Sequence, residues 1–388
     1  MTRTPRLLVY WAGGLERAGG IGRVLGNLLD ASRAAERPYV MKIMDTRGPY
    51  SIYVSPLFFS VALARTVIMA AFARQGLAAH VNMAHKGSTV RKVIVCRLLA
   101  MLRIPYLLHL HANNYDTYFE TRPGWAKNLI RRAFIDADKI VVLGALWHKV
   151  VVDDIGADPR KILTIRNGVP DPGKPGPLPQ PDCPLILFLG ELQAWKGLGE
   201  LIEAFASDRL RDQPWKLIVA GRGLEETYRA AAETAGIGHR VSFTGWLPRD
   251  AVQKLLREAS IVALPSYVEG LSVTLVEALS HGVPVVATAV GAHPDILRDR
   301  ENAILVRIRD AESLAEGLRC LLDDRSLAEK VGRGGRKLFE ECLEISEIEK
   351  HFHDIYEDLL QGAPSPRDAL DRAEPGAAET AGESRGLV

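Results

Sequence analysis

Runs of consecutive apolar residues alternate along the chain with longer stretches of helical periodicity. In the first half these runs predict strands at RLLVYWA (6–12), YVMKIMD (39–45), AAHVNM (78–83), YLLHLHA (106–112) and KIVVLG (139–144). In the second half they predict strands at LILFLGE (185–191), KLIVAG (216–221), VSFTG (241–245), IVALP (261–265) and PVVAT (284–288). Parallel strands that are buried on both faces are apolar throughout, and their alternation with helices indicates doubly wound sheets. The pattern therefore predicts an α/β protein with two Rossmann-like domains.

A proline-rich stretch, PDPGKPGPLPQPDCP (170–184), separates the two halves. Because proline fixes φ and lacks a backbone donor, this stretch cannot be a helix or a central strand. We therefore expect an N-terminal domain at 1–169, a linker at 170–184 and a C-terminal domain at 185–345. A helical pattern at 346–361 predicts a C-terminal helix that packs back towards the first domain. The composition of 362–388 predicts a disordered tail.

The composition of the 388-residue chain, with 47% hydrophobic and 25% charged residues, is typical of a soluble enzyme with more than one domain. The formal net charge of +2 gives no reason to expect nucleic acid as a partner. The four cysteines lack the close spacing of zinc ligands, so we expect reduced thiols. The N-terminus has no secretory pattern, which favours a cytoplasmic protein.

The longest apolar region spans residues 52–73 and contains Pro56 near its start and Arg65 near its middle. Proline and arginine are both unfavourable features for a segment that spans a bilayer. We therefore expect a buried amphipathic helix in this region instead of a membrane span.

A glycine-rich segment follows the first predicted strand. Gly20, Gly22 and Gly26 lead into a helix, and Asp45 ends the next strand. A NAD site would place pyrophosphate on this helix N-terminus and the acid on a ribose. However, about seven residues separate the strand from the glycines, whereas the dinucleotide fingerprint should follow the strand at once. A loop that receives the diphosphate or sugar of another ligand fits this spacing better.

Four loops of the second half follow predicted strands. They carry Lys196, Arg222, the segment 245–248 and Glu269. The carboxyl ends of parallel strands form the ligand-binding edge of an open α/β sheet, and Lys suits a phosphate. Each cation or acid could instead be a solvated surface charge, but their arrival at one edge favours an anionic ligand.

The last of these loops leads into a short apolar helix. Ser272 is placed to cap it, so the free amides near Gly270, Leu271 and Ser272 should face the same edge and accept an anion. Glu269 lies just ahead of the helix and can reach sugar hydroxyls. Glu277 lies within the helix and can accept two hydrogen bonds from a ribose diol.

These motifs together resemble the retaining glycosyltransferases of family 4, which have the GT-B fold of two Rossmann-like domains facing each other across a cleft. Glu269 and Glu277 match the E-x7-E signature of that family. The segments GGIGRVLGNLL, LGELQAWKG, GRG, GWL and HGVPVVATAVGAHPDIL occur in the family's order, and the resemblance extends over most of the chain. The resemblance implies an enzyme that moves a sugar from a nucleotide-diphosphate sugar, a UDP- or GDP-sugar, to a hydroxyl group.

The resemblance also implies roles for individual residues. Glu277 would hold the ribose, and the loop at Leu247 would hold the base. Lys196 and the amides of Gly270, Leu271 and Ser272 would hold the diphosphate. Glu269 would contact the transferred sugar. Gly19 and Gly20 of the first domain would close on that sugar, beside His111. We expect Lys196, Glu269 and Glu277 to line one cavity between the domains.

One position departs from the family pattern. The family commonly has an arginine about five positions before the lysine, and this chain has Glu191 there. Arg222 is our candidate for the missing cation. Because of Glu191, a non-catalytic glycan- or nucleotide-binding module stays open as an alternative, beside a NAD-dependent oxidoreductase that would use Gly20–Gly26.

The last expectations concern a cofactor, a metal and the acceptor. We expect no resident cofactor and no metal, because His109 and His111 lack a third ligand at suitable spacing. Between Arg91 and Lys139 the chain has nine Lys or Arg and four Asp or Glu among apolar residues. This segment suits an anionic membrane surface. The sequence also resembles those of exopolysaccharide and capsule enzymes. This resemblance implies a glycan or polyprenyl-diphosphate-linked acceptor and peripheral contact with the inner face of the plasma membrane.

Overall fold

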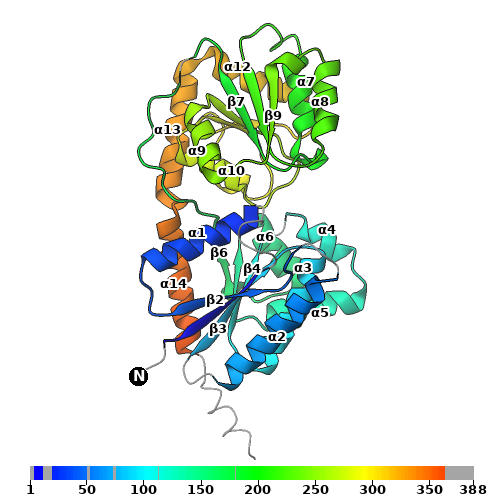
Figure 1. Ribbon diagram of the computed structural model, residues 1–388, viewed down its shortest axis with the longest axis vertical. Helices are drawn as coiled ribbons and strands as arrows, with labels where there is room; N and C mark the ends of the chain where they lie inside the picture. The colour runs from blue at the N-terminus through cyan, green and yellow to red at the C-terminus, as the bar shows by residue number, and fades with distance from the viewer. Residues whose placement is uncertain are drawn as a thin grey trace, which may run out of the picture.

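The computed structural model describes residues 4–11, 20–49, 53–72, 76–111, 113–179 and 181–362. Gly19 and the tail beyond residue 362 lie outside the described residues. The described chain forms two lobes, and each lobe is a parallel sheet with helices on both faces (Figure 1).

The first sheet has six strands in the order β2-β1-β3-β4-β5-β6, all parallel. Its strands are β1 (Arg6–Trp11), β2 (Val40–Asp45), β3 (Leu77–Met83), β4 (Tyr106–Leu110), β5 (Lys139–Val142) and β6 (Ile162–Thr164). Its helices are α1 (Gly20–Ala34), α2 (Ser55–Ala71), α3 (Gly87–Met101), α4 (Tyr115–Glu120), α5 (Gly124–Ile135) and α6 (Ala145–Lys149), which continues as a π-helix over Val150–Ile155.

The second sheet is also parallel and has the order β12-β11-β10-β7-β8-β9. Its strands are β7 (Leu185–Leu189), β8 (Lys216–Ala220), β9 (Val241–Gly245), β10 (Ile261–Leu264), β11 (Val285–Thr288) and β12 (Ile304–Val306). Its helices are α7 (Leu198–Ala206), α8 (Glu225–Thr234), α9 (Arg249–Glu258), α10 (Val273–Ser280), α11 (His293–Ile296), α12 (Ala311–Asp323) and α13 (Arg325–Cys342).

All ten predicted strands are present, and the two doubly wound domains are confirmed. Two strands were not predicted, β6 and β12. Each has three residues and lies at an edge of its sheet. An edge strand has one neighbour and needs no long apolar run, so the apolar pattern does not reveal it.

The chain crosses between the lobes twice, and the two crossings are bonded to each other. Val169 pairs with Glu344 in an isolated bridge. The amide of Val169 donates to Leu343 O at 3.2 Å, and the amide of Ile345 donates to Val169 O at 3.0 Å. Further along the first crossing, the Arg336 guanidinium donates to both oxygens of Asp171 at 2.8 Å. These bonds hold the two sheets in a fixed relation.

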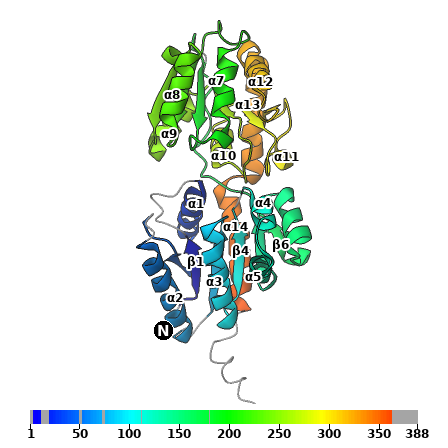
Figure 2. The ribbon, with the colours of Figure 1, turned by 90° about the vertical axis from the view of Figure 1, so that its right-hand side faces the viewer.

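The second crossing ends in α14 (Ile345–Gln361), which lies against α1 and β3 of the first lobe. Figure 2 shows α14 beside the first sheet, below the lobe that contains α13. The buried Glu349 accepts from Ser32 at 2.9 Å and from Arg37. The C-terminal helix is thus part of the core of the first domain.

The expectation for residues 52–73 is wrong in part. The region does form a helix, α2, but the only residues of α2 that are buried are the small ones Ala62, Thr66 and Ala70. Leu57, Val61 and Ile68 are exposed, whereas Phe59, Leu63 and Met69 are half-buried and pack against the core. Among the described residues, every helix is too short or too polar to cross a membrane.

Candidate active site

Lys196 and Glu269 meet at the carboxyl edge of the second sheet. Lys196 ends a short 3₁₀ turn after β7, and Gly197 follows with φ of +72°. A Cβ at Gly197 would lie 2.1 Å from Pro265 O, so this sharp turn requires glycine. The turn brings Lys196 Nζ onto Glu269 Oε1, which also accepts from Ser266 Oγ at 2.9 Å. Lys196, predicted to bind the donor diphosphate, therefore forms an ion pair with Glu269, the predicted catalytic residue at the transferred sugar.

The loop between Glu269 and α10 is held from both domains. Ser272 caps α10 as predicted, accepting from the Leu275 amide at 3.4 Å. Gly291 approaches so closely that a Cβ there would lie 2.0 Å from Glu269 O. From the first domain, Asn167 donates to Leu271 O at 2.8 Å. The N-terminus of α10, where the predicted amides lie, is thereby fixed in position.

Glu277 is bound across the domain boundary by a residue that the sequence did not single out. Arg23 Nη1, on α1, lies 2.9 Å from each oxygen of Glu277. The Glu277 side chain is 4% exposed and that of Arg23 is 32% exposed. Burial raises the pKa of Glu277, and the charge of Arg23 opposes this rise. The carboxylate of Glu277 is buried and bound by the partly exposed Arg23. This arrangement is consistent with a site where a ligand can compete with Arg23 for the carboxylate.

Gly20 lies beside this pair. A Cβ on Gly20 would lie 3.6 Å from Val273 at the start of α10. Arg23 comes one helical turn after Gly20, so the start of α1 presents a cation to α10. In the sequence, Arg23 is a single arginine in the segment GGIGR. That it points to Glu277 is evident only from the position of the second lobe against α1.

Arg222, the candidate for the cation missing at position 191, lies over an aromatic ring. Its guanidinium lies 5.4 Å from the ring centre of Trp246 on an exposed surface. Glu191 is also exposed, so its acid is solvated. Leu247, in the loop where the base was expected, is half-buried and packs against the core. The cations that contact the two acids are Lys196, on Glu269, and Arg23, on Glu277.

His111 belongs to a buried cluster of imidazoles on β3 and β4 of the first domain. Its Nε2 lies 2.8 Å from Asn82 Oδ1, while Asn82 Nδ2 donates to Tyr10 O at 3.4 Å. Asn82 therefore accepts from His111 Nε2, which leaves Nδ1 of His111 as the acceptor. Burial lowers the pKa of His111 to about 3. Asn82 is a second functional candidate that sequence reasoning missed.

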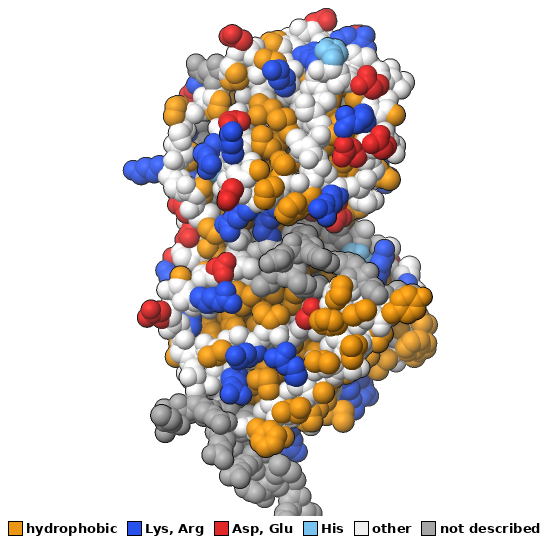
Figure 3. Space-filling view, viewed as in Figure 1, with side chains coloured by type: hydrophobic (Ala, Val, Ile, Leu, Met, Phe, Trp, Pro, Cys, Tyr) orange, Lys and Arg blue, Asp and Glu red, His pale blue; other side chains and the backbone are white. Residues whose placement is uncertain are grey.

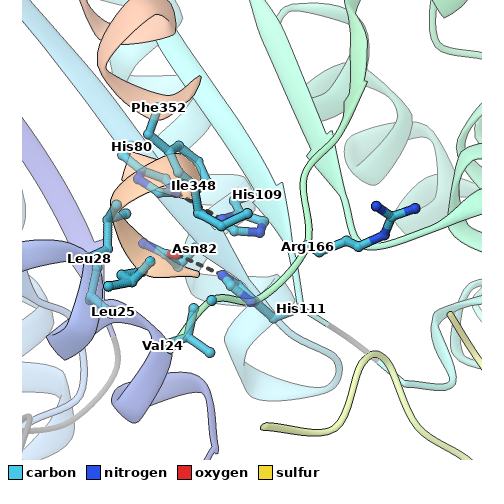
Figure 4. A pocket seen from close by; sticks show the side chains of 12 residues that line it. Val24, Leu25, Leu28, His80, Asn82, His109, His111, Arg166, Ile348 and Phe352 are labelled. Carbon is cyan, nitrogen blue, oxygen red and sulfur yellow. Dashed lines mark hydrogen bonds between the residues drawn. The ribbon is translucent and has the colours of Figure 1, made fainter. Parts of the chain in front are cut away.

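The described cavity lies beside these histidines and not between the predicted donor residues. It is lined by α1, α14 and the histidine cluster, and its volume of about 10 Å³ has room for roughly one water molecule (Figure 4). Lys196, Glu269 and Glu277 do not line it. The expectation of one cavity lined by all three therefore stays a prediction.

The glycines considered as an alternative for a dinucleotide loop are helical. Gly20, Gly22 and Gly26 all lie within α1, and Asp45 accepts from the amides of Arg47 at 2.8 Å and Gly48 at 2.9 Å in the turn after β2. Asp45 therefore shapes its own turn. Among the described residues, no group of three or more His, Cys, Asp or Glu is arranged to hold a metal ion.

Comparison with known proteins gives a class for this arrangement. Residues 174–338 match the family model of the glycosyl transferases group 1. An uncharacterised glycosyltransferase of Methanocaldococcus jannaschii is 30% identical over 183 residues, which are 47% of this chain and 47% of that protein. The chain thus spans about half the length of this curated relative. Over these residues the chain is similar to glycosyl transferases of group 1, which supports a transferase enzyme.

Solved structures extend the likeness to both lobes. Sucrose-phosphate synthase from Thermosynechococcus elongatus superposes with a TM-score of 0.75 at 18% identity, covering 92% of this chain and all of that chain. HepE from Anabaena in complex with UDP-glucose gives a TM-score of 0.69 at 17% identity, covering 91% of this chain and 99% of that one. At these identities the likeness shows the fold, which is the GT-B fold of glycosyltransferases.

Proposed function

We propose that this protein is a retaining glycosyltransferase of family 4, which moves a sugar from a nucleotide-diphosphate sugar to a hydroxyl acceptor. One observation carries the proposal. Lys196, Glu269 and the N-terminus of α10 form one cluster in the second domain, and further along α10 Glu277 meets Arg23 of the first domain. An enzyme of this kind must hold a diphosphate and a sugar between two domains, and this arrangement offers cations, helix amides and carboxylates for both.

The leaving diphosphate sets the chemical demand. Negative charge grows on it as the glycosidic bond breaks, and preorganised Lys196, Arg23 and helix amides can neutralise that charge. We propose that these groups act without a resident cofactor, with the sugar nucleotide as co-substrate. Glu269 already accepts from Lys196 and Ser266. This supports a role in contacting the sugar instead of attacking it, with the acceptor proton passing to the leaving phosphate on the same face.

The donor can be identified by thermal stabilisation with UDP-, GDP- and ADP-sugars. A true donor at ten times its dissociation constant should stabilise the protein by about 1.4 kcal/mol. UDP-sugars come first, because the similar HepE structure contains UDP-glucose. NMR of the product anomer then tests retention. Nicotinamide binding without donor turnover would favour the oxidoreductase, and donor binding without any hydrolysis would favour the non-catalytic module.

We propose that Arg23 supplies the diphosphate cation that Glu191 does not. The Arg23→Ala variant should then lose about tenfold or more in affinity for the stabilising nucleoside diphosphate, because a charge-assisted hydrogen bond is lost. Affinity for the corresponding monophosphate should change little. Isothermal titration of the two nucleotides checks this. If Arg23 merely competes with nucleotides for Glu277, the variant should bind both of them more tightly, which would contradict the proposal.

The acceptor proposed from sequence is a glycan or polyprenyl-diphosphate-linked oligosaccharide of exopolysaccharide or capsule assembly. His111 is the residue of the first domain proposed to approach it. The neutral ring with Nδ1 free of Asn82 is suited to accept a hydrogen bond from an acceptor or sugar hydroxyl. We propose a cytoplasmic protein that meets such a lipid-linked acceptor at the inner face of the plasma membrane.

A further inference from the structure

Large apolar side chains are exposed on one layer of the first domain. Of 18 exposed large hydrophobic residues in the described ranges, 13 lie between Tyr53 and Ile135. This part of the chain contains α2, α3 and α5, and α3 contacts both of the other helices. Figure 3 shows hydrophobic side chains gathered over the lower lobe, with Lys and Arg between them. Contiguous exposed apolar surface on this scale usually marks an interaction site.

Helix α2 exposes a stripe of large apolar side chains. Its exposed apolar stripe has the spacing i, i+4, i+11 and i+15 and consists of Leu57, Val61, Ile68 and Phe72. The side that faces the sheet has the small residues Ala62, Thr66 and Ala70. Thr66 is fixed there by hydrogen bonds to Tyr10 and to Ala62 O. The stripe therefore faces away from the sheet, while Phe59, Leu63 and Met69 are half-buried against the core.

The two neighbouring helices continue this surface and add charge to it. On α3 the exposed stripe consists of Val90, Ile94, Arg97 and Met101 at i, i+4, i+7 and i+11. On α5 it consists of Trp125, Leu129 and Arg132 at i, i+4 and i+7. Each stripe thus sets an arginine among large apolar side chains. This combination is typical of helices that lie in a membrane interface.

The charge of this region has one sign. Between Tyr53 and Ile135 the sequence has eleven Lys or Arg and two Asp or Glu. Arg65, Arg97 and Arg132 are exposed and form no ion pair with another described residue. The chain as a whole is nearly neutral, at +2, so the positive charge is concentrated here.

We propose that the outer surface of α2, α3 and α5, which we call the basic apolar face, docks onto a membrane that contains anionic phospholipids. The apolar side chains enter the boundary between headgroups and acyl chains, and each nearby cation adds about 1 kcal/mol of attraction to the anionic surface. A second copy of the chain fits less well, because it would bring two strongly basic surfaces together. The inference deepens the acceptor part of the proposed function and is independent of the donor chemistry.

Flotation of the full chain with vesicles tests this proposal. We expect binding to vesicles of equimolar phosphatidylcholine and phosphatidylglycerol, weaker binding to phosphatidylcholine alone, and weakening by salt. Ile68→Glu should reduce the partition coefficient at least about tenfold, since a buried apolar contact is lost and a like charge is added. Ile308→Glu is the matched control in the second domain; Ile68 is 55% exposed and Ile308 is 45% exposed. It should bind like the unchanged protein.

Two charge-reversal variants test the contribution of the basic residues. Arg97→Glu should weaken binding to the anionic vesicles, whereas Lys330→Glu on the exposed side of α13 should not. Equal binding by Ile68→Glu and Ile308→Glu would overturn the proposal. So would a dimer, measured by light scattering, that Ile68→Glu dissociates. Lys196→Ala should still bind vesicles, so failure of docking and failure of the donor chemistry are separable.

Discussion

Replacing Lys196 with alanine should lower the rate of donor hydrolysis by about a hundredfold to a thousandfold, the effect of removing one preorganised donor from a site where charge develops. Lys196 is held by the turn at Gly197 and by contact with Glu269, so it needs no rearrangement to meet a diphosphate. The loss should appear mainly in kcat, because the negative charge on the diphosphate grows as the bond breaks. Steady-state hydrolysis of the identified sugar nucleotide measures it.

Two variants separate a chemical effect from a structural one. Lys330→Ala removes an exposed lysine of α13 and should leave hydrolysis unchanged. Lys196→Arg keeps the charge but not its shape, and should recover part of the rate with an altered KM. If Lys196→Ala hydrolyses donor at the rate of Lys330→Ala while remaining folded, Lys196 has no part in the reaction and the site must lie elsewhere.

The strands could be predicted because burial on both faces leaves a direct mark on the sequence. LILFL and KLIVA have the composition of central strands and are β7 and β8. The cap at Ser272 could be predicted for a similar reason, since its hydrogen bond is local. The edge strands β6 and β12 could not, because their short segments depend on a neighbour that is distant in sequence.

The sequence did not show in which direction individual side chains point in the folded protein. The apolar content of α2 predicted burial, but whether large or small residues face the sheet depends on the close approach of that helix. Arg23 was passed over for the same reason, since its partner Glu277 lies 254 positions away. Arg222 was chosen for its position at the right sheet edge, but its side chain lies over Trp246. Local patterns identified the elements of the site and did not identify which side chains meet.

The histidine cluster should make the first domain sensitive to acid. His80 Nδ1 lies 2.7 Å from the Tyr356 hydroxyl of α14, and His80 Nε2 lies 3.2 Å from His109 Nδ1. The rings of His109 and His111 are 3.7 Å apart. Burial is the main cause that lowers the pKa of His80 and of His111 to about 3, and it lowers that of His109 well below its ordinary value. All three imidazoles are therefore neutral in the folded protein down to acidic pH.

The direction of the effect follows from which state binds more protons. In the unfolded chain these histidines take up protons below about pH 6.5. In the folded protein the pKa of His80 and of His111 is lowered to about 3, and that of His109 lies well below its ordinary value. The contribution of the three neutral histidines to the free energy of unfolding is therefore fully present above about pH 6.5 and is lost as the pH decreases. The free energy of unfolding falls by up to about 4 kcal/mol per pH unit once all three are protonated only in the unfolded state. Urea unfolding at several pH values measures this slope. His109→Gln should reduce the slope by about 1.4 kcal/mol per pH unit, while the exposed His239→Gln control should not; equal slopes for the two variants would mean that the cluster is protonated in the folded protein.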